Sequence, residues 1–431
     1  MRVFLLGGYG LIGKEVGQAL LGAGHQVVAA ARDPQLGERL LPAAEWHRVD
    51  LNSGLESKDW TPFLKGCDAV VNAAGALQSG GGDRLSVSQR DSLQGLFAAC
   101  ESAGVERFVQ ISAPGASPKA ETEFLRTKGE ADAALAASKL AWTVLKPGLV
   151  LAPTAYGGTA LLRTLVAMPL VQPLLLGQAR FQCVAAQEVA AAVLTCLRDP
   201  ELAGKSFDLM EAEAHSFRDL VLAVRNWLGF GAPWAILSVP LVLGLALARL
   251  ADLSAFFGWR SPLRSTALKV MAKDVIGDPA PWETASGQTM KDLETILKGL
   301  PSTRQERVFA RHMLVFPFGV LTLSAFWLIS GLVAVLEAGR ASHVLLPVMQ
   351  EGLAITLVYA GALLDLAIGV ILLFRRRFRL GCLLSLGVSL LYLALASVFL
   401  PGLWLDPLGP LVKVLPAILL AVYLAMLAEE R

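Results

Sequence analysis

Residues 3–31 read VFLLGGYGLIGKEVGQALLGAGHQVVAAA, and their apolar runs and glycines predict the fold of the first part of the chain. Two short apolar runs, residues 3–6 and 26–31, have the composition of buried parallel strands. Between them lies a glycine-rich loop, and the apolar residues that follow it recur with helical spacing. The stretch therefore predicts a strand, a loop, a helix and a second strand in that order.

This order of elements is the one that a dinucleotide-binding loop requires. Glycines let the backbone approach a pyrophosphate closely, and the N-terminus of the following helix offers unpaired N–H groups and the positive end of its dipole. The alternative is a tight turn without a ligand. We expect the phosphates to be held by Gly7, Gly8, Tyr9, Gly10, Leu11, Ile12 and Gly13.

The end of the second strand bears on the choice of cofactor. An acidic residue at this position binds the ribose hydroxyls of NAD, whereas an arginine accommodates the 2′-phosphate of NADP. The chain has Arg32 followed by Asp33. Arg32 favours NADP(H), and Asp33 leaves NAD(H) open. The alternative is that Arg32 is a solvated turn residue with no role in cofactor binding.

The glycine spacing GxxGxxG, formed by Gly7, Gly10 and Gly13, resembles that of the extended and atypical short-chain dehydrogenases/reductases. The resemblance covers about residues 1–230 and implies a Rossmann-type α/β fold with a doubly wound parallel sheet. It also implies cofactor-binding roles for residues that match further motifs of the superfamily. These are Asp50 and Leu51 beside the adenine, the turn Ala73, Ala74 and Gly75 after the fourth strand, and Pro147 in a Lys-Pro-Gly motif.

Catalysis in this superfamily uses a serine together with a tyrosine four residues before a lysine, and the tyrosine is the general acid/base. Ser112 stands at the expected serine position and Lys128 at the lysine position, but residue 124 is phenylalanine. The resemblance implies that Lys128 still holds the nicotinamide ribose. Phe124 has no proton to exchange, which argues against ordinary carbonyl reduction.

Alternatives remain open at each of these positions. Lys128 is otherwise an exposed helix lysine beside Glu130 and Asp132, and Ser112 otherwise only caps a loop. Tyr156 is a remote alternative source of a hydroxyl group. The same phenylalanine is tolerated in the NmrA-like group and in the nucleotide-binding accessory subunit of respiratory complex I, which the chain resembles. Those relatives bind NADP(H) with little turnover.

Charge is distributed unevenly along the chain. Only 17% of the 431 residues are charged and the net charge is +2, so a nucleic-acid-coating protein is excluded. Residues 313–431 contain 7 of the 38 basic and 6 of the 36 acidic residues. We therefore expect a soluble domain over 1–230, a helical connector over 231–312 and a membrane domain over 313–431. The connector includes an apolar helix over Trp234–Ala248, which we expect to be buried or at the membrane surface, with a membrane span as the alternative. It also includes a helix over Thr284–Leu297.

Four apolar segments in the last part are long enough to cross a bilayer. They are Met313–Leu336, Gly352–Phe374, Leu380–Leu400 and Leu408–Ala428. Arginines at 304, 307 and 311 precede the first segment, and Arg375, Arg376, Arg377 and Arg379 separate the second from the third. Because basic loops stay in the cytoplasm, we expect a multi-pass inner-membrane protein with a cytoplasmic nucleotide domain and C-terminus.

This four-helix unit resembles the DoxX-like membrane family, with Phe326–Gly331, Leu364–Gly369 and Trp404–Lys413 as the matching motifs. The resemblance implies a loose link to quinone- and sulfur-related redox proteins. Asp365 and Lys413 are charges within the expected spans, and such charges usually mark function or lock helices together. Lys413 has a second interpretation, in which its amine reaches outward to the interface.

Two functions follow from these observations. The first is an NAD(P)H-binding oxidoreductase that passes reducing equivalents to a quinone or another lipid-soluble acceptor. The second is a catalytically inactive nucleotide-binding scaffold or assembly factor for a membrane complex. A transporter-like role is a third interpretation, and it rests on Asp365 alone. The five histidines show no metal-binding spacing, so we expect no metal site.

Overall fold

The computed structural model describes residues 1–75, 84–259, 272 and 274–428. The chain forms two compact units. The first comprises Met1–Asp252 and Ser261–Ala310, and the second comprises Leu253–Arg260 and Arg311–Arg431. The residues predicted as a connector, 231–312, contribute to both units. Residues 429–431, which include the C-terminus expected in the cytoplasm, and residues 260–271 and 273 of the connector lie outside the described part.

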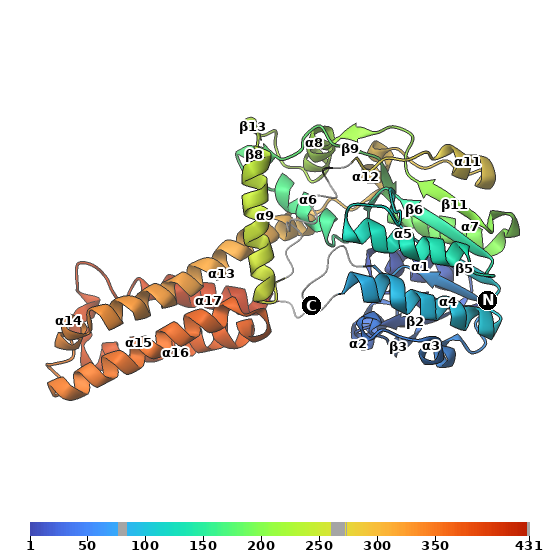
Figure 1. Ribbon diagram of the computed structural model, residues 1–431. Coiled ribbons are helices and arrows are strands. Elements are labelled where there is room, and N and C mark those ends of the chain that lie inside the picture. Colours follow the sequence, from blue (N-terminus) through green and yellow to red (C-terminus); the bar gives the residue numbers. More distant parts are fainter. Residues whose placement is uncertain (76–83, 260–271, 273, 429–431) are drawn as a thin grey trace. The chain divides into compact units, whose positions relative to one another are not determined.

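A seven-stranded parallel sheet forms the centre of the first unit (Figure 1). Its strand order is β3-β2-β1-β4-β5-β6-β11, which confirms the predicted doubly wound Rossmann-type fold. The strands are β1 (Arg2–Leu6), β2 (Gln26–Ala31), β3 (Glu45–Arg48), β4 (Ala69–Asn72), β5 (Arg107–Ile111), β6 (Trp142–Pro147) and β11 (Lys205–Leu209). The order reverses between β1 and β4, so the crevice for a ligand lies at the carboxyl ends of these two strands.

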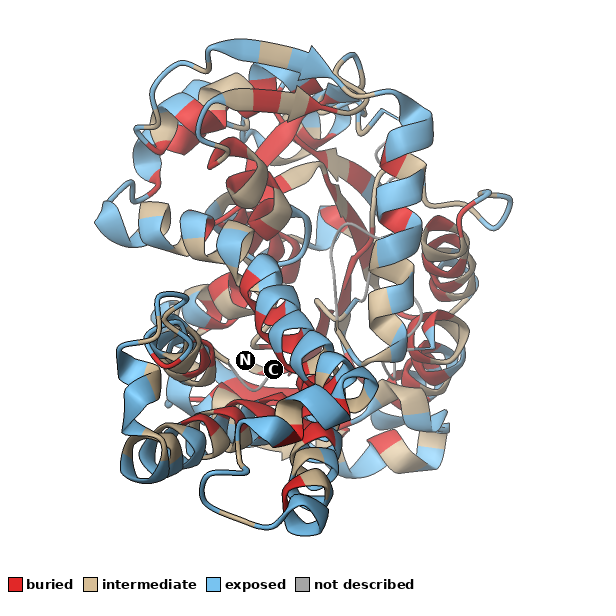
Figure 2. Ribbon diagram, turned by 90° about the vertical axis from the view of Figure 1, so that its left-hand side faces the viewer, coloured by how far each residue is buried: buried red, intermediate tan, exposed pale blue. Residues whose placement is uncertain are grey.

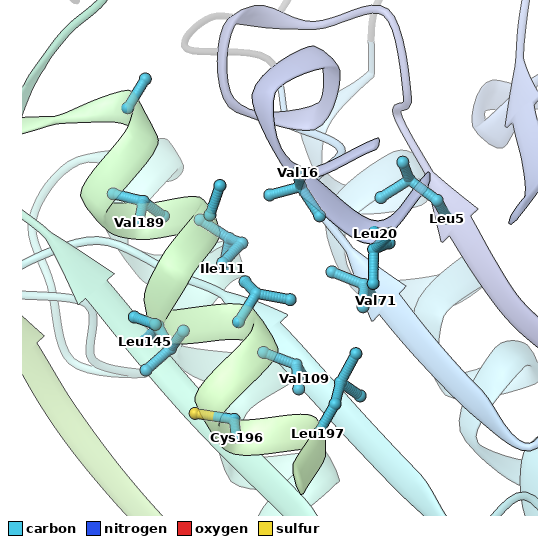
Figure 3. Packing of buried hydrophobic residues seen from close by; sticks show 14 of the residues in the cluster. Leu5, Val16, Leu20, Val71, Val109, Ile111, Leu145, Val189, Cys196 and Leu197 are labelled. Atoms are coloured by element: carbon cyan, nitrogen blue, oxygen red, sulfur yellow. The ribbon is translucent and has the colours of Figure 1, made fainter. Parts of the chain in front are cut away.

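Helices cover both faces of the sheet, which explains why its central strands are apolar runs without alternation. On one face, α1 (Leu11–Gly22) and α7 (Ala186–Arg198) pack Val16, Leu20 and Val189 onto the sheet (Figure 3). On the other face, α3 (Ser57–Leu64), α4 (Ser92–Ala103) and α5 (Glu123–Ala136) cover a second core that includes Phe4 and Phe108. Figure 2 shows these central strands as buried.

Shorter elements complete the first unit. Three strand pairs join β7 (Leu149–Leu151) to β10 (Cys183–Ala185), β8 (Val171–Leu174) to β13 (Ala235–Ser238), and β9 (Arg180–Phe181) to β12 (His215–Ser216). The remaining described helices are α2 (Pro34–Leu40), α6 (Gly158–Val166), α8 (Phe217–Trp227), α9 (Leu241–Phe256), α11 (Ala280–Ser286) and α12 (Leu293–Gly299).

Two predicted helices of the connector were wrong in their extent. The helix expected over Trp234–Ala248 begins only at Leu241, because residues 235–238 pair with β8 and Pro240 stands where the helix starts. The helix expected over Thr284–Leu297 is two helices, α11 and α12. Gly287 ends α11 in the left-handed conformation at φ 68°, which continuous helix does not permit.

The second unit is a helical bundle. It contains α13 (Arg304–Leu336, which starts in the first unit), α14 (Ala338–His343), α15 (Glu351–Leu373), α16 (Phe378–Phe399) and α17 (Val414–Leu427). Among the described residues, α13, α15 and α16 are long and apolar enough to cross a membrane, as predicted. Small helical turns, Arg375–Arg377 and Pro401–Trp404, adjoin them.

The fourth predicted segment differs from its expectation. Helix α17 begins at Val414 and has 14 residues, so it is shorter than the three candidate spans. Residues 408–413 form turns, and Lys413 is exposed at the N-terminal end of α17. Lys413 therefore precedes α17 and does not lie inside the helix, as the predicted segment 408–428 had placed it, whereas the interpretation in which its amine reaches the interface stays a prediction.

Candidate functional site

The glycine loop occupies the switch point of the sheet. Gly7 follows β1 with φ 80°, its N–H donates to the Ala30 carbonyl at 3.0 Å, and the Gly10 N–H donates to the Gly7 carbonyl at 2.9 Å. A Cβ atom at Gly13 would stand 2.1 Å from the Gly7 oxygen, and one at Gly7 would stand 2.7 Å from Ala74. The tight loop therefore requires glycine at these positions.

The remaining residues of the loop offer backbone rather than side chains. Leu11 and Ile12 begin α1 and pack their side chains against the core. Gly8 is buried, and Tyr9 stacks on Trp46 with ring centroids 6.3 Å apart. The first turn of α1 thus presents its N–H groups at the carboxyl end of β1, which is the arrangement that binds a pyrophosphate.

The residues predicted to read the ribose and the adenine follow β2 and β3. Arg32 is exposed directly after β2. Asp33 caps α2, and its carboxylate accepts from the Leu36 N–H at 3.1 Å. Asp50 caps a short turn in the same way by accepting from the Asn52 N–H at 3.0 Å, and Leu51 begins that turn. Asp33 therefore has a structural role of its own as the cap of α2.

The turn after β4 faces the glycine loop. The buried side chain of Asn72 accepts from the Ala74 N–H at 3.0 Å and donates to Gln110 on β5 at 2.9 Å. The Ala73 N–H donates to the Leu6 carbonyl at 2.9 Å. These bonds hold Ala73, Ala74 and Gly75 beside Gly7, so the structure brings the two predicted loops together.

Lys128 lies beneath this turn. Its side chain is 7% exposed, and its ammonium group donates to the Ile111 carbonyl at 2.9 Å. A Cβ atom at Gly75 would stand 3.5 Å from Nζ. The alternative of an exposed helix lysine was therefore wrong. Phe124 lies one helical turn before Lys128 on α5, with its ring centroid 6.0 Å from Nζ.

Ser112 follows β5 directly, and its hydroxyl donates a short hydrogen bond to the Asp132 carboxylate. The other carboxylate oxygen of Asp132 is buried without a hydrogen-bond partner in the described part of the chain. Burial raises the pKa of Asp132, and the Ser112 bond and the Lys128 charge oppose that rise. Burial lowers the pKa of Lys128, which Asp132 opposes.

Asp132 belongs to this site although it was not predicted from the sequence. It stands four residues after Lys128 on α5 and so shares a helix face with it, and this spacing was the available signal. Pro147 is buried at the carboxyl end of β6, on the same edge of the sheet as Ser112. Tyr156 is 53% exposed in the loop before α6.

A second polar cluster lies inside the helical bundle. Asp365 on α15 is 6% exposed. Its two carboxylate oxygens accept hydrogen bonds from Tyr392 on α16 at 3.2 Å and from Ser330 on α13 at 3.3 Å. The carboxylate therefore joins three helices, and each of its oxygens accepts a hydrogen bond, as a buried carboxylate requires.

A doubly wound sheet with a glycine loop at its switch point defines the class of Rossmann-type nucleotide-binding domains. Residues 7–200 match the NAD(P)H-binding family, and residues 324–422 match the DoxX-like family. An uncharacterized sugar epimerase, YhfK of Bacillus subtilis, is 30% identical over 154 residues, which are 34% of this chain and 72% of the relative. The chain thus belongs to the NAD(P)H-binding family and carries a DoxX-like domain after it.

Other similar proteins share only part of the chain. Photosystem II assembly factor Ycf39 of Synechocystis is 27% identical over 149 residues, which cover 34% of this chain and 44% of that protein. The Bordetella bronchiseptica enzyme WbmG in complex with NAD and UDP has a TM-score of 0.52 at 16% identity, over 69% of this chain and 93% of that one. This structural likeness shows the same fold, in a protein that holds NAD.

Proposed function

We propose that the chain is a membrane-anchored NADP(H)-binding oxidoreductase that passes reducing equivalents to a quinone or another lipid-soluble acceptor. The observation that carries this proposal is the glycine loop with buried Lys128 beneath its facing turn, in the same chain as a DoxX-like membrane domain. When bound, a nicotinamide nucleotide supplies a hydride. The loop N–H groups would bind its pyrophosphate, and Lys128 would hold its ribose.

The phenylalanine at position 124 fits an acceptor of this kind. Reduction of a simple carbonyl leaves a strongly basic alkoxide, which needs a proton from a positioned acid such as tyrosine. A reduced quinone is a weaker base and takes its proton from water. Phe124 is therefore compatible with quinone reduction, which needs no proton from the protein. Reduction of an aldehyde would need the proton donor that Phe124 lacks.

The preference for NADP(H) over NAD(H) rests on Arg32. Its position after β2 suits a 2′-phosphate, and the neighbouring Asp33 caps α2. Arg32→Ala should weaken NADPH binding about tenfold or more, which corresponds to ~1.4 kcal/mol, and leave NADH binding nearly unchanged. Arg39→Ala, a change at an exposed arginine on α2, is the control. Equal losses for both nucleotides would refute the preference.

The proposed location is the inner membrane, with the nucleotide domain and the C-terminus in the cytoplasm. The arginines at 375–377 support this orientation, since basic loops are retained on that side. The partners in this proposal are the lipid bilayer and the acceptor within it.

A second candidate is a nucleotide-binding scaffold that assembles a membrane complex. Two observations favour the scaffold. Phe124 stands where the superfamily has its general acid/base tyrosine, and the chain is similar to a relative named as an assembly factor. In this case the bound nucleotide would stabilise the fold, and the partner would be another membrane protein.

Turnover distinguishes the two candidates. The full chain in phospholipid vesicles is mixed with NADPH and either a short-chain ubiquinone analogue or an aldehyde, and the loss of nucleotide absorbance is followed. The oxidoreductase proposal expects oxidation with the quinone and little with the aldehyde. Saturable NADPH binding without oxidation by either acceptor would contradict it and support the scaffold.

A further inference from the structure

Helix α9, labelled in Figure 1, buries small residues and exposes large apolar ones, which is the reverse of a helix in water. Its two buried residues are Gly244 and Ala248, and a Cβ atom at Gly244 would stand 2.5 Å from Leu175. The large side chains point away from the protein and are exposed: Leu241, Val242, Leu243, Leu247, Leu250, Leu253 and Phe256. A soluble amphipathic helix places its large apolar side chains inward, so this outer face needs an apolar environment.

The residues just after α9 belong to the second unit, and they contact its helices. The Arg375 N–H donates to the Phe257 carbonyl at 3.0 Å, and the Trp259 indole donates to the Leu373 carbonyl at 2.6 Å. Both aromatic rings pack edge-on, Phe257 with Phe374 and Trp259 with Phe378, at 5.2 and 5.3 Å between centroids. The C-terminal end of α9 is thereby fixed at the end of the bundle that carries the arginines at 375–377.

Two further features indicate the depth of the helix. Arg249 is exposed on α9 among the outward leucines, and an arginine reaches the headgroups from a helix in the interface but is costly at the centre of a bilayer. Trp234, which precedes the strand leading into α9, is 83% exposed. Tryptophan is enriched where a membrane meets water.

We propose that α9 is an interfacial helix, whose outward leucines and Phe256 lie among the headgroups and upper acyl chains of the leaflet adjoining the arginines at 375–377. The occupant of this face is the bilayer that the chain already spans, because the helix ends where the membrane unit begins. This contact is independent of nucleotide chemistry. It gives the chain an attachment to the membrane beyond its spanning helices.

Spin labels test the depth directly. Cysteines are placed at Ala246→Cys and Leu250→Cys, two exposed positions of α9, in the full chain reconstituted into phospholipid vesicles. The five native cysteines are buried, which limits background labelling. Ala133→Cys on the exposed face of α5 is the matched control for water, and Leu363→Cys on α15 is the reference for a bilayer-embedded position.

The measured quantity is the collision rate of each label with oxygen, which concentrates in lipid, and with a water-soluble nickel chelate. Both α9 labels should gain oxygen collisions and lose nickel collisions relative to Ala133→Cys, at a shallower depth than Leu363→Cys. Labels that behave like Ala133→Cys would show a water-exposed helix and overturn the proposal. Labels as deep as Leu363→Cys would show a spanning helix and also overturn it.

A second copy of the chain is the competing occupant of this face. Dimerisation through α9 would broaden the spectra of both labels by spin–spin coupling, and dilution with unlabelled protein would remove that broadening. The proposal expects spectra that do not change on dilution. Broadening that dilution removes would overturn it, and the Leu363→Cys spectrum recorded in parallel verifies that each preparation is inserted.

Discussion

At the scale of single residues, the nucleotide loop can close only because its glycines have no Cβ atom. The Gly7 carbonyl occupies the space where Gly13 would carry a Cβ atom, and Ala74 occupies the corresponding space at Gly7. The role of both glycines in the loop was predicted from the sequence, because the GxxGxxG spacing is regular. The sequence did not predict Asp132, since its bond to Ser112 depends on how closely α5 approaches the end of β5.

Gly13→Ala should displace the first turn of α1 from the Gly7 carbonyl and lower NADPH affinity by about tenfold or more, because overpacking of this kind costs about 1–3 kcal/mol. Gly22→Ala is the matched control in the same helix, since a Cβ atom there meets nothing within 4 Å. Equilibrium binding measured by nucleotide fluorescence compares the two. Unchanged affinity in Gly13→Ala would show that the loop does not hold the nucleotide.

The pKa of Lys128 predicts an alkaline limit for binding. Burial depresses this pKa, so the charged form that we propose for the ribose contact is lost as pH rises through a value below the usual ~10.4 of lysine. Wild-type affinity for NADPH should therefore fall at alkaline pH, in a range where an exposed lysine is still charged. Lys128→Met should bind more weakly and lack this step. An identical pH profile in both proteins would exclude the lysine from the site.

At the scale of elements, helix crossings in the bundle depend on small residues and a few polar contacts. Helices α13 and α15 approach so closely that a Cβ atom at Gly331 would stand 2.7 Å from the Ala362 carbonyl. Ser324 on α13 donates to the Gly369 carbonyl on α15 at 2.8 Å. In a bilayer the lipid tails are as apolar as the side chains, so the hydrophobic effect does not drive helices together. Helices associate instead through close backbone packing and interhelical hydrogen bonds.

Gly331→Ala should therefore lower the thermal stability of the detergent-solubilised chain, since the alanine methyl group would meet backbone that cannot move aside. Gly387→Ala on α16, where nothing lies within 4 Å, should be neutral or slightly stabilising, as alanine favours helix. The unfolding midpoint of each variant is compared with wild type. Equal midpoints for the two variants would mean that the α13–α15 contact contributes nothing.

Some helices and strands could be predicted from the sequence and others could not. The three long spans were predicted because an uninterrupted apolar run admits few other structures. The fourth was predicted too long, since residues 408–413 are mostly apolar and their turns depend on Gly409, whose φ is 58°, and on neighbouring prolines. The strand β13 was missed because Ala235–Ser238 reads as helix until β8 pairs with it.

At the scale of the whole molecule, the chain combines a nucleotide domain with a membrane bundle. The uneven charge distribution predicted this division. The identity of the electron acceptor did not follow from either part, because the site residues define how a nucleotide is held and not what receives its hydride.

Orientation in the membrane is tested with reporter fusions. Alkaline phosphatase, active only outside the cytoplasm, should be active when fused after residue 349, between α14 and α15, and inactive after residue 377. Fusion after residue 428 should be inactive as well, which requires α17 to cross the membrane despite its 14 residues. The reverse pattern at residues 349 and 377 would place the nucleotide domain outside the cytoplasm.

The proposed function requires that the first unit holds a nicotinamide nucleotide while the chain is in a membrane. The most direct measurement is equilibrium dialysis of NADPH, and separately of NADH, against the purified full chain in lipid nanodiscs, with Gly13→Ala as the comparison. We expect saturable binding of one nucleotide per chain, tighter for NADPH than for NADH and weaker in Gly13→Ala than in the wild-type chain. Absence of saturable binding for both nucleotides to the wild-type chain would contradict it.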